Sequence, residues 1–149
     1  MPSLLNAPGP RYEALLQLLR TAEALWESSR TFFARWDLSP SQFNVLNLLF
    51  GNSAGMTQTD LSRELIMHRS NVTGLIDRLE KRGLAERQPV PNDRRAHRVV
   101  LTRRGNRLIR KVLPHYWAAA EDALGHLPVK QAGRLAADLD RISQNADDL

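Results

Sequence analysis

The feature that most restricts the fold of this 149-residue chain is a short amphipathic stretch near its centre. Four apolar residues repeat there at i, i+3, i+4 and i+7, the spacing of one face of an α-helix. They are Val72, Leu75, Ile76 and Leu79. Gly83 follows, and glycine suits the left-handed position just after a helix. The stretch predicts a helix that runs to about Arg82 and buries one face.

A shorter helix is predicted directly before it. The Thr57 hydroxyl can cap its first turn, and Asp60 places negative charge there. Leu61 and Leu65 supply its buried positions. Only a short turn at residues 66–68 separates the two helices, so the pair reads as a helix-turn-helix.

Two stretches that favour strands come next, at residues 84–88 and 96–101. Residues 89–93 between them are rich in turn formers, and their prolines are expected to block strand pairing. Arg94 and Arg95 follow this segment at once. We therefore expect a β-hairpin with a basic, projecting tip.

Longer helices flank this central part. The first, from Arg11 to Trp36, has apolar residues at spacings of three, four or seven and is too long to be covered by one small core. The next should start with Ser39 as its cap and Pro40 in its first turn. Two helices follow residue 102, and Pro114 should kink the first of them without ending it. The predicted fold is mainly α, a winged helix-turn-helix with a small β-hairpin wing.

Charge is concentrated in the same central part. Residues 57–111 contain 14 basic and 6 acidic residues, a balance of +8, whereas residues 1–56 are neutral and residues 112–149 carry −3. Arginine provides 18 of the 21 basic residues, and its forked guanidinium fits phosphates and guanine edges. The distribution predicts a segment that meets a polyanion, with a solvated charged face as the alternative.

The second helix of a helix-turn-helix fits the DNA major groove. Asn71 could pair with adenine, Arg69 or Arg78 could fork onto guanine, and Gly74 would let the DNA come close. The predicted contacts on this helix are Arg69, Ser70, Asn71, Thr73, Gly74 and Arg78. Asp77 is expected to pair with a wing arginine instead of a base.

The wing suits the minor groove, whose narrow A·T tracts attract inserted arginines. Arg94 and Arg95 are the predicted minor-groove residues, and His97 and Arg98 are expected to contact flanking phosphates. The alternative is a solvated turn, or a winged domain that binds protein.

Three segments resemble the MarR family of winged helix regulators. The wing, residues 93–102 followed by Gly105, is similar to the family's wing pattern in full. Residues 73–84 resemble the end of its recognition helix, and residues 38–43 the start of its second helix. Two positions depart from the pattern, because Ile66 stands where glycine is common and His68 where Asp or Ser is common.

The resemblance covers nearly the whole chain and implies a single domain, 1–149, that forms a homodimer. A winged lobe, 38–102, would bind a palindromic double-stranded DNA operator, and 10–37 with 103–149 would form the helical dimerisation region. Arg95 would be the minor-groove arginine, and Asp93 would hold an arginine by a salt bridge. Most members of the family are repressors that small ligands release.

Aromatic residues suggest where a small aromatic or lipophilic effector could bind. The predicted pocket consists of Trp26, Phe33, Trp36 and Phe43, and the alternative is ordinary core and dimer packing. The chain has no cysteine, which excludes thiol-based sensing.

No metal site, cofactor or enzyme activity is predicted, because the histidines are scattered and no catalytic grouping of side chains is recognisable. No stretch approaches the roughly 18 apolar residues of a membrane span, so a cytoplasmic location is expected. The function predicted is a ligand-responsive repressor. The alternative is a winged helix module, binding DNA or protein, with no effector.

Overall fold

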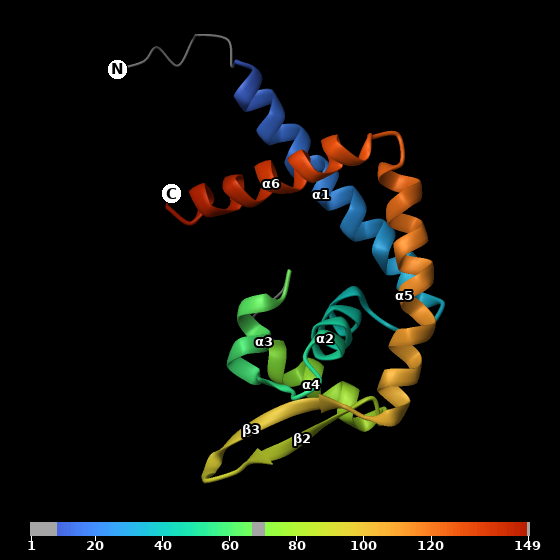
Figure 1. Ribbon diagram of the computed structural model, residues 1–149, viewed down its shortest axis with the longest axis vertical. Coiled ribbons are helices and arrows are strands. Elements are labelled where there is room, and N and C mark those ends of the chain that lie inside the picture. The colour runs from blue at the N-terminus through green and yellow to red at the C-terminus, as the bar shows by residue number, and fades with distance from the viewer. Residues whose placement is uncertain (1–8, 67–70, 149) are drawn as a thin grey trace. The chain divides into compact units, whose positions relative to one another are not determined.

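The computed structural model describes residues 9–66 and 71–148, which form helices and one small antiparallel sheet (Figure 1). The elements in chain order are α1 Pro10–Ala34, α2 Pro40–Gly51, β1 Met56–Thr57, α3 Gln58–Glu64, α4 Val72–Lys81, β2 Ala85–Val90, β3 Asp93–Leu101, α5 Arg103–Leu124 and α6 Val129–Ala146. The predicted fold class, mainly α with a hairpin wing, is confirmed. The chain divides into two compact units, residues 1–109 and 110–149.

The start of α2 follows from its sequence. The Ser39 hydroxyl accepts a hydrogen bond from the Gln42 backbone N–H (3.1 Å), and the Gln42 side chain accepts one from the Ser39 N–H (3.0 Å). This reciprocal pair is a capping box, and Pro40 occupies the first turn as predicted. The box satisfies backbone donors that a helix N-terminus otherwise leaves unpaired.

The helix-turn-helix consists of α3 and α4. Thr57 caps α3 as predicted, accepting a hydrogen bond from the Asp60 N–H (3.1 Å). The four apolar residues that predicted α4 are all buried: Val72, Leu75, Ile76 and Leu79. Gly83 has φ +67, the left-handed conformation expected of it.

The sheet has the strand order β1-β3-β2, so β3 is its central strand. β2 and β3 pair antiparallel from Ala85 opposite Leu101 outward, and together they form the wing. In the view of Figure 1 this ribbon runs beneath α3 and α4. The two-residue strand β1, which sequence analysis missed, pairs Met56 with Val99.

The predicted wing tip was too long. Pro89 pairs with His97 inside the ladder, and only Pro91 and Asn92 form the turn. Pro89 is tolerated because β2 is an edge strand, where a missing N–H need not break a ladder. Asn92 has φ +68, and proline followed by a residue of positive φ is the pattern of a type II turn.

The core of the first unit gathers around an aromatic stack. The Phe33 ring of α1 lies on the Phe43 ring of α2 with centroids 4.2 Å apart and planes 20° apart. The other large side chains buried in this unit come from α2, α3, α4, β3 and α5 and from the segments that join them. They include Leu46, Leu49, Leu61, Leu65, Ile76, Leu79, Leu84, Val99 and Ile109.

One threonine joins the wing to the helices on either side of it. The Thr102 hydroxyl donates to the Gly83 carbonyl (2.6 Å) and accepts from the Gly105 N–H (3.0 Å). A Cβ at position 105 would lie 1.9 Å from the Leu84 carbonyl oxygen, so only glycine fits there. The Thr-x-x-Gly part of the wing pattern therefore has a structural cause.

The second unit comprises the rest of α5 and α6. α5 continues through Pro114, as predicted. No residue of α6 is buried within its described range, 129–146. None of the helices in the described part of the chain is long and apolar enough to cross a membrane.

Candidate nucleic-acid interface

The face of α4 opposite its buried residues is the first part of the candidate interface. Arg78 is exposed on it, as are Thr73 and Asp77, and exposed Asn71 is the residue just before the helix. The predicted contacts Arg69 and Ser70 lie outside the described residues. Thr73 and Arg78 therefore lie on the solvent side of α4, as the amphipathic pattern predicted.

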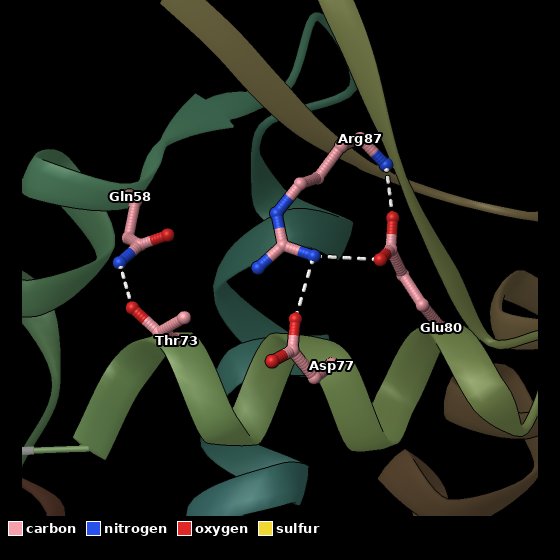
Figure 2. Close-up of polar contacts among 5 residues, drawn as sticks. All are labelled: Gln58, Thr73, Asp77, Glu80 and Arg87. Carbon is pink, nitrogen blue, oxygen red and sulfur yellow. Dashed lines mark hydrogen bonds and ion pairs between the residues drawn. The ribbon is translucent and has the colours of Figure 1, made fainter.

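Two predicted contact residues, Thr73 and Asn71, lie close to other residues of the chain. The Gln58 side-chain amide donates a hydrogen bond to the Thr73 hydroxyl, which links α3 to α4 (Figure 2). The Asn71 amide lies over Gly74, since a Cβ there would be 2.5 Å from the Asn71 Oδ1. Gly74 therefore makes room for Asn71, and close approach of DNA at this position stays a prediction.

The second part is the wing. The four basic candidates of β3 are all exposed: Arg94, Arg95, His97 and Arg98. Val90 pairs with Asp93 although the preceding Pro89 pairs with His97, so residues 94–96 form a bulge in β3. Bulges redirect side chains near functional sites, and this one contains both tip arginines.

Asp93 acts on the backbone of this bulge. Its Oδ1 accepts a hydrogen bond from the Arg95 N–H (3.0 Å). The salt bridge expected for Asp93 is not seen, since no arginine of the described residues is ion-paired with it. The carboxylate instead fixes the main chain at Arg95.

Sequence analysis missed the most connected side chain of the wing, Arg87 of β2. Its Nη1 lies 2.9 Å from Asp77 Oδ1 and 2.6 Å from Glu80 Oε2, both on α4 (Figure 2). The Arg87 backbone N–H also donates to Glu80 Oε1 (2.8 Å). The prediction that Asp77 pairs with a wing arginine is confirmed.

Just past the C-terminal end of α4, Arg82 contacts the turn that follows α1. The Arg82 guanidinium donates to the Asp37 carbonyl and lies 3.7 Å from its carboxylate. Asp37 has φ +53, a conformation that non-glycine residues seldom adopt, and it turns the chain after α1. Arg82 and Asp37 are 45 residues apart in the sequence, so no local sequence pattern predicts their contact.

The four residues of the predicted effector pocket do not line one common hollow in the described part of the chain. Phe33 and Phe43 are 2% and 1% exposed and stack in the core, so neither lines an open cavity. Trp36 packs near Phe32, with the Arg35 guanidinium 4.6 Å from its ring. The aromatic packing that competed with the pocket hypothesis explains these three residues.

Trp26 lies in a different place. It lines a hollow of about 260 Å³ with Arg30 and the first residues of α2, Ser39, Pro40 and Ser41. Across the described residues, no cluster of three His, Cys, Asp or Glu side chains could hold a metal ion.

Comparisons with known proteins agree with this geometry. The MarR family model matches residues 36–96. The transcriptional regulator FarR of Neisseria gonorrhoeae is 28% identical over 128 residues, which cover 84% of this chain and 87% of FarR.

Two solved structures are also similar to this chain. The transcriptional repressor CouR, bound to a 23-mer DNA duplex, is 31% identical with a TM-score of 0.75, covering 85% of this chain and 89% of that one. AbsC, a MarR family regulator of Streptomyces coelicolor, has the same fold, with a TM-score of 0.83, 23% identity and coverage of 96% and 98%.

Proposed function

Because this chain belongs to the MarR family of DNA-binding transcription regulators, we propose that it represses transcription from a palindromic operator, which it binds as a homodimer. A small aromatic or lipophilic ligand releases it from the DNA. Proteins of this family are transcription regulators and not enzymes, so the proposal contains no catalytic step.

The observation that carries the DNA-binding part is the exposed basic bulge of the wing. Arg94 and Arg95 stand at a two-residue turn on a paired ribbon, with the Arg95 backbone fixed by Asp93. Arginines on a narrow, stiff projection suit the minor groove, while the exposed face of α4 suits the major groove. CouR, a relative with the same fold, is bound to duplex DNA in its structure.

Exposed apolar side chains support the homodimer. Those of α1 are 49–59% exposed: Tyr12, Leu15, Leu19 and Leu25. Those of the second unit include Trp117, Leu124, Val129, Leu135 and Ile142. Apolar faces of this kind are typical of subunit interfaces, and a two-fold dimer would present two identical wings to two half-sites.

The test of operator binding is selection of duplexes from a random library by the purified chain. We expect an inverted repeat with half-sites about 34–36 Å apart from centre to centre, one turn of the double helix. Light scattering of the same sample should give a dimer. A monomer, or a selected sequence without two-fold symmetry, would overturn the proposal.

The substitution Arg95→Ala tests the wing. It should weaken binding to the selected duplex by about tenfold or more, since contacts of this kind contribute about 1–3 kcal/mol. Fluorescence anisotropy of a labelled duplex measures the loss. Arg134→Ala, an exposed arginine of α6, is the control and should bind as the unsubstituted chain does. Equal affinity of the Arg95 variant and this control would refute the assignment.

One observation favours a second candidate, a DNA-binding regulator without an effector. Of the four residues predicted to form the effector pocket, Trp26 lines a hollow of about 260 Å³, and this hollow is smaller than the roughly 300–1,000 Å³ of most ligand sites. Thermal shift with a panel of aromatic carboxylates separates the two candidates, because a ligand that binds only the folded chain raises its Tm. A raised Tm together with release of the duplex supports the ligand-responsive repressor. No shift across the panel and unchanged duplex binding support the second candidate.

A further inference from the structure

The helix proposed to enter the major groove carries two carboxylates. The charged residues of α4 are two acidic and two basic ones, Asp77, Glu80, Arg78 and Lys81, so the net charge of the helix side chains is zero. The side chains of Asp77 and Glu80 are 51% and 32% exposed. Placing like charges together across an interface is costly, so uncompensated carboxylates at this position would oppose the phosphates of DNA.

Arg87 compensates both carboxylates from the neighbouring strand. One guanidinium nitrogen lies within 2.9 Å of both, between the side chains of Asp77 and Glu80 (Figure 2). The Arg87 side chain is only 25% exposed, which makes it the least accessible member of the cluster. Its charge is therefore directed at α4 and not at the solvent.

Glu80 also completes the edge of the sheet. β2 is an edge strand, and edge strands present backbone N–H groups that no neighbouring strand accepts. The Arg87 N–H points to α4, and Glu80 Oε1 accepts its hydrogen bond at 2.8 Å. The carboxylate thus takes the place of a missing strand and fastens the base of the wing to α4.

We propose that Arg87 is a positioning residue for DNA binding. It screens Asp77 and Glu80 from the phosphates and holds the base of the wing against α4, without contacting DNA itself. The proposal rests on the proposed function, since it assigns a role within the same interface. Arg87 affects DNA binding only through the carboxylates of Asp77 and Glu80.

A double-mutant cycle tests this dependence. Arg87→Gln is made in the unsubstituted chain and in a chain with Asp77→Asn and Glu80→Gln. Affinity for the selected duplex is measured by fluorescence anisotropy at a temperature where all variants are folded. We expect a loss of about tenfold or more in the first background and less than about threefold in the second, because neutral partners need no screening.

Arg95→Ala provides the matched control. This substitution should lower the affinity for the duplex by the same factor in both backgrounds, because Arg95 does not contact Asp77 or Glu80. If Arg87→Gln is not folded at any usable temperature, Arg87→Lys goes through the same cycle. Lysine keeps the positive charge but not the planar guanidinium whose Nη1 lies between the two carboxylates, so its loss of affinity should be smaller than that expected for Arg87→Gln and should occur only where the carboxylates are present.

The outcomes are distinct. Equal losses for the Arg87 variant in both backgrounds mean that Arg87 contacts DNA directly and overturn this proposal alone. Variants that differ in Tm but bind equally well show a purely structural pair and also overturn it. Failure of the unsubstituted chain to bind any duplex overturns the proposed function, and this proposal with it.

Discussion

The winged part of the chain and its C-terminal helices differ in where their apolar side chains lie. α2 buries six of its 12 residues, whereas α6 buries none in its described range of 18. α2 also begins with a capping box, while α6 begins at Pro128 with no side-chain cap. One helix is stabilised by its own core and its own cap, and the other by neither.

The difference between the helices lies in which of them bury their apolar side chains within this chain. Isolated helices are marginal in water, and most of their stability in proteins comes from packing an apolar face. α1 shows the same deficit, because within residues 10–34 Phe33 is its one buried residue. The winged part carries its own core, whereas α6 and most of α1 leave apolar side chains exposed, as the proposed homodimer requires.

The largest expected effect concerns the core of the winged part. Phe43→Ala removes half of the aromatic stack and should lower the free energy of unfolding by about 3–5 kcal/mol, as large-to-small changes do in a packed core. Urea unfolding followed by circular dichroism measures this. Phe43→Leu, which keeps most of the apolar volume, is the control and should lose clearly less. Similar losses for both would mean that the stack is not the centre of the core.

The next effect concerns the C-terminal side. Leu135→Asp puts a carboxylate on the apolar face of α6, and burying a Leu side chain contributes about 1.5–3 kcal/mol. The dissociation constant of the dimer should rise by about tenfold or more, as measured by sedimentation velocity. Ala137→Asp lies about 200° around the helix from Leu135 and should leave association unchanged. Dimers of equal affinity in both variants would place the partner surface elsewhere.

The smallest expected effect concerns the capping box of α2, which α6 lacks. Ser39→Ala removes the side-chain acceptor of the α2 capping box and should cost about 1 kcal/mol in the free energy of unfolding. Ser53→Ala, an exposed loop substitution, is the control and is expected to be neutral. If the two variants unfold at the same urea concentration, the box adds nothing to stability and the contrast with α6 rests on burial alone.

Local signals in the sequence predicted the framework. Ser39, Thr57 and Gly83 act through groups within a few residues, and each occupies the position that its chemistry indicates. The buried face of α4 was also predictable, because helical periodicity is a property of one short segment. The exposure of the wing candidates Arg94, Arg95, His97 and Arg98 was also predictable from one short segment.

Contacts between segments were not predictable in this way. The pairing of β1 with β3 joins residues more than 40 apart, and two residues leave no periodicity to detect. Glu80 and Arg87 each look like an ordinary surface charge until β2 is packed against α4. Phe33 and Phe43 were assigned to a pocket because aromatic residues suit both ligand sites and cores, and only the packing of α1 on α2 decides between them.

The length of the wing limits how far from α4 its tip can reach along a DNA duplex bound as proposed. The nine residues of β3 lie opposite the six residues of β2, because residues 94–96 bulge, so the paired ribbon spans five steps of about 3.3 Å, or roughly 17 Å. Half a turn of the double helix, which separates a major groove from the next minor groove, advances about 17 Å. The paired ribbon is about as long as this step, and the turn at its end adds only Pro91 and Asn92. Lengthening both strands by two residues would move Arg94 and Arg95 about 7 Å further from the base of the wing, so in the proposed complex the number of residues in the strands decides which groove they reach.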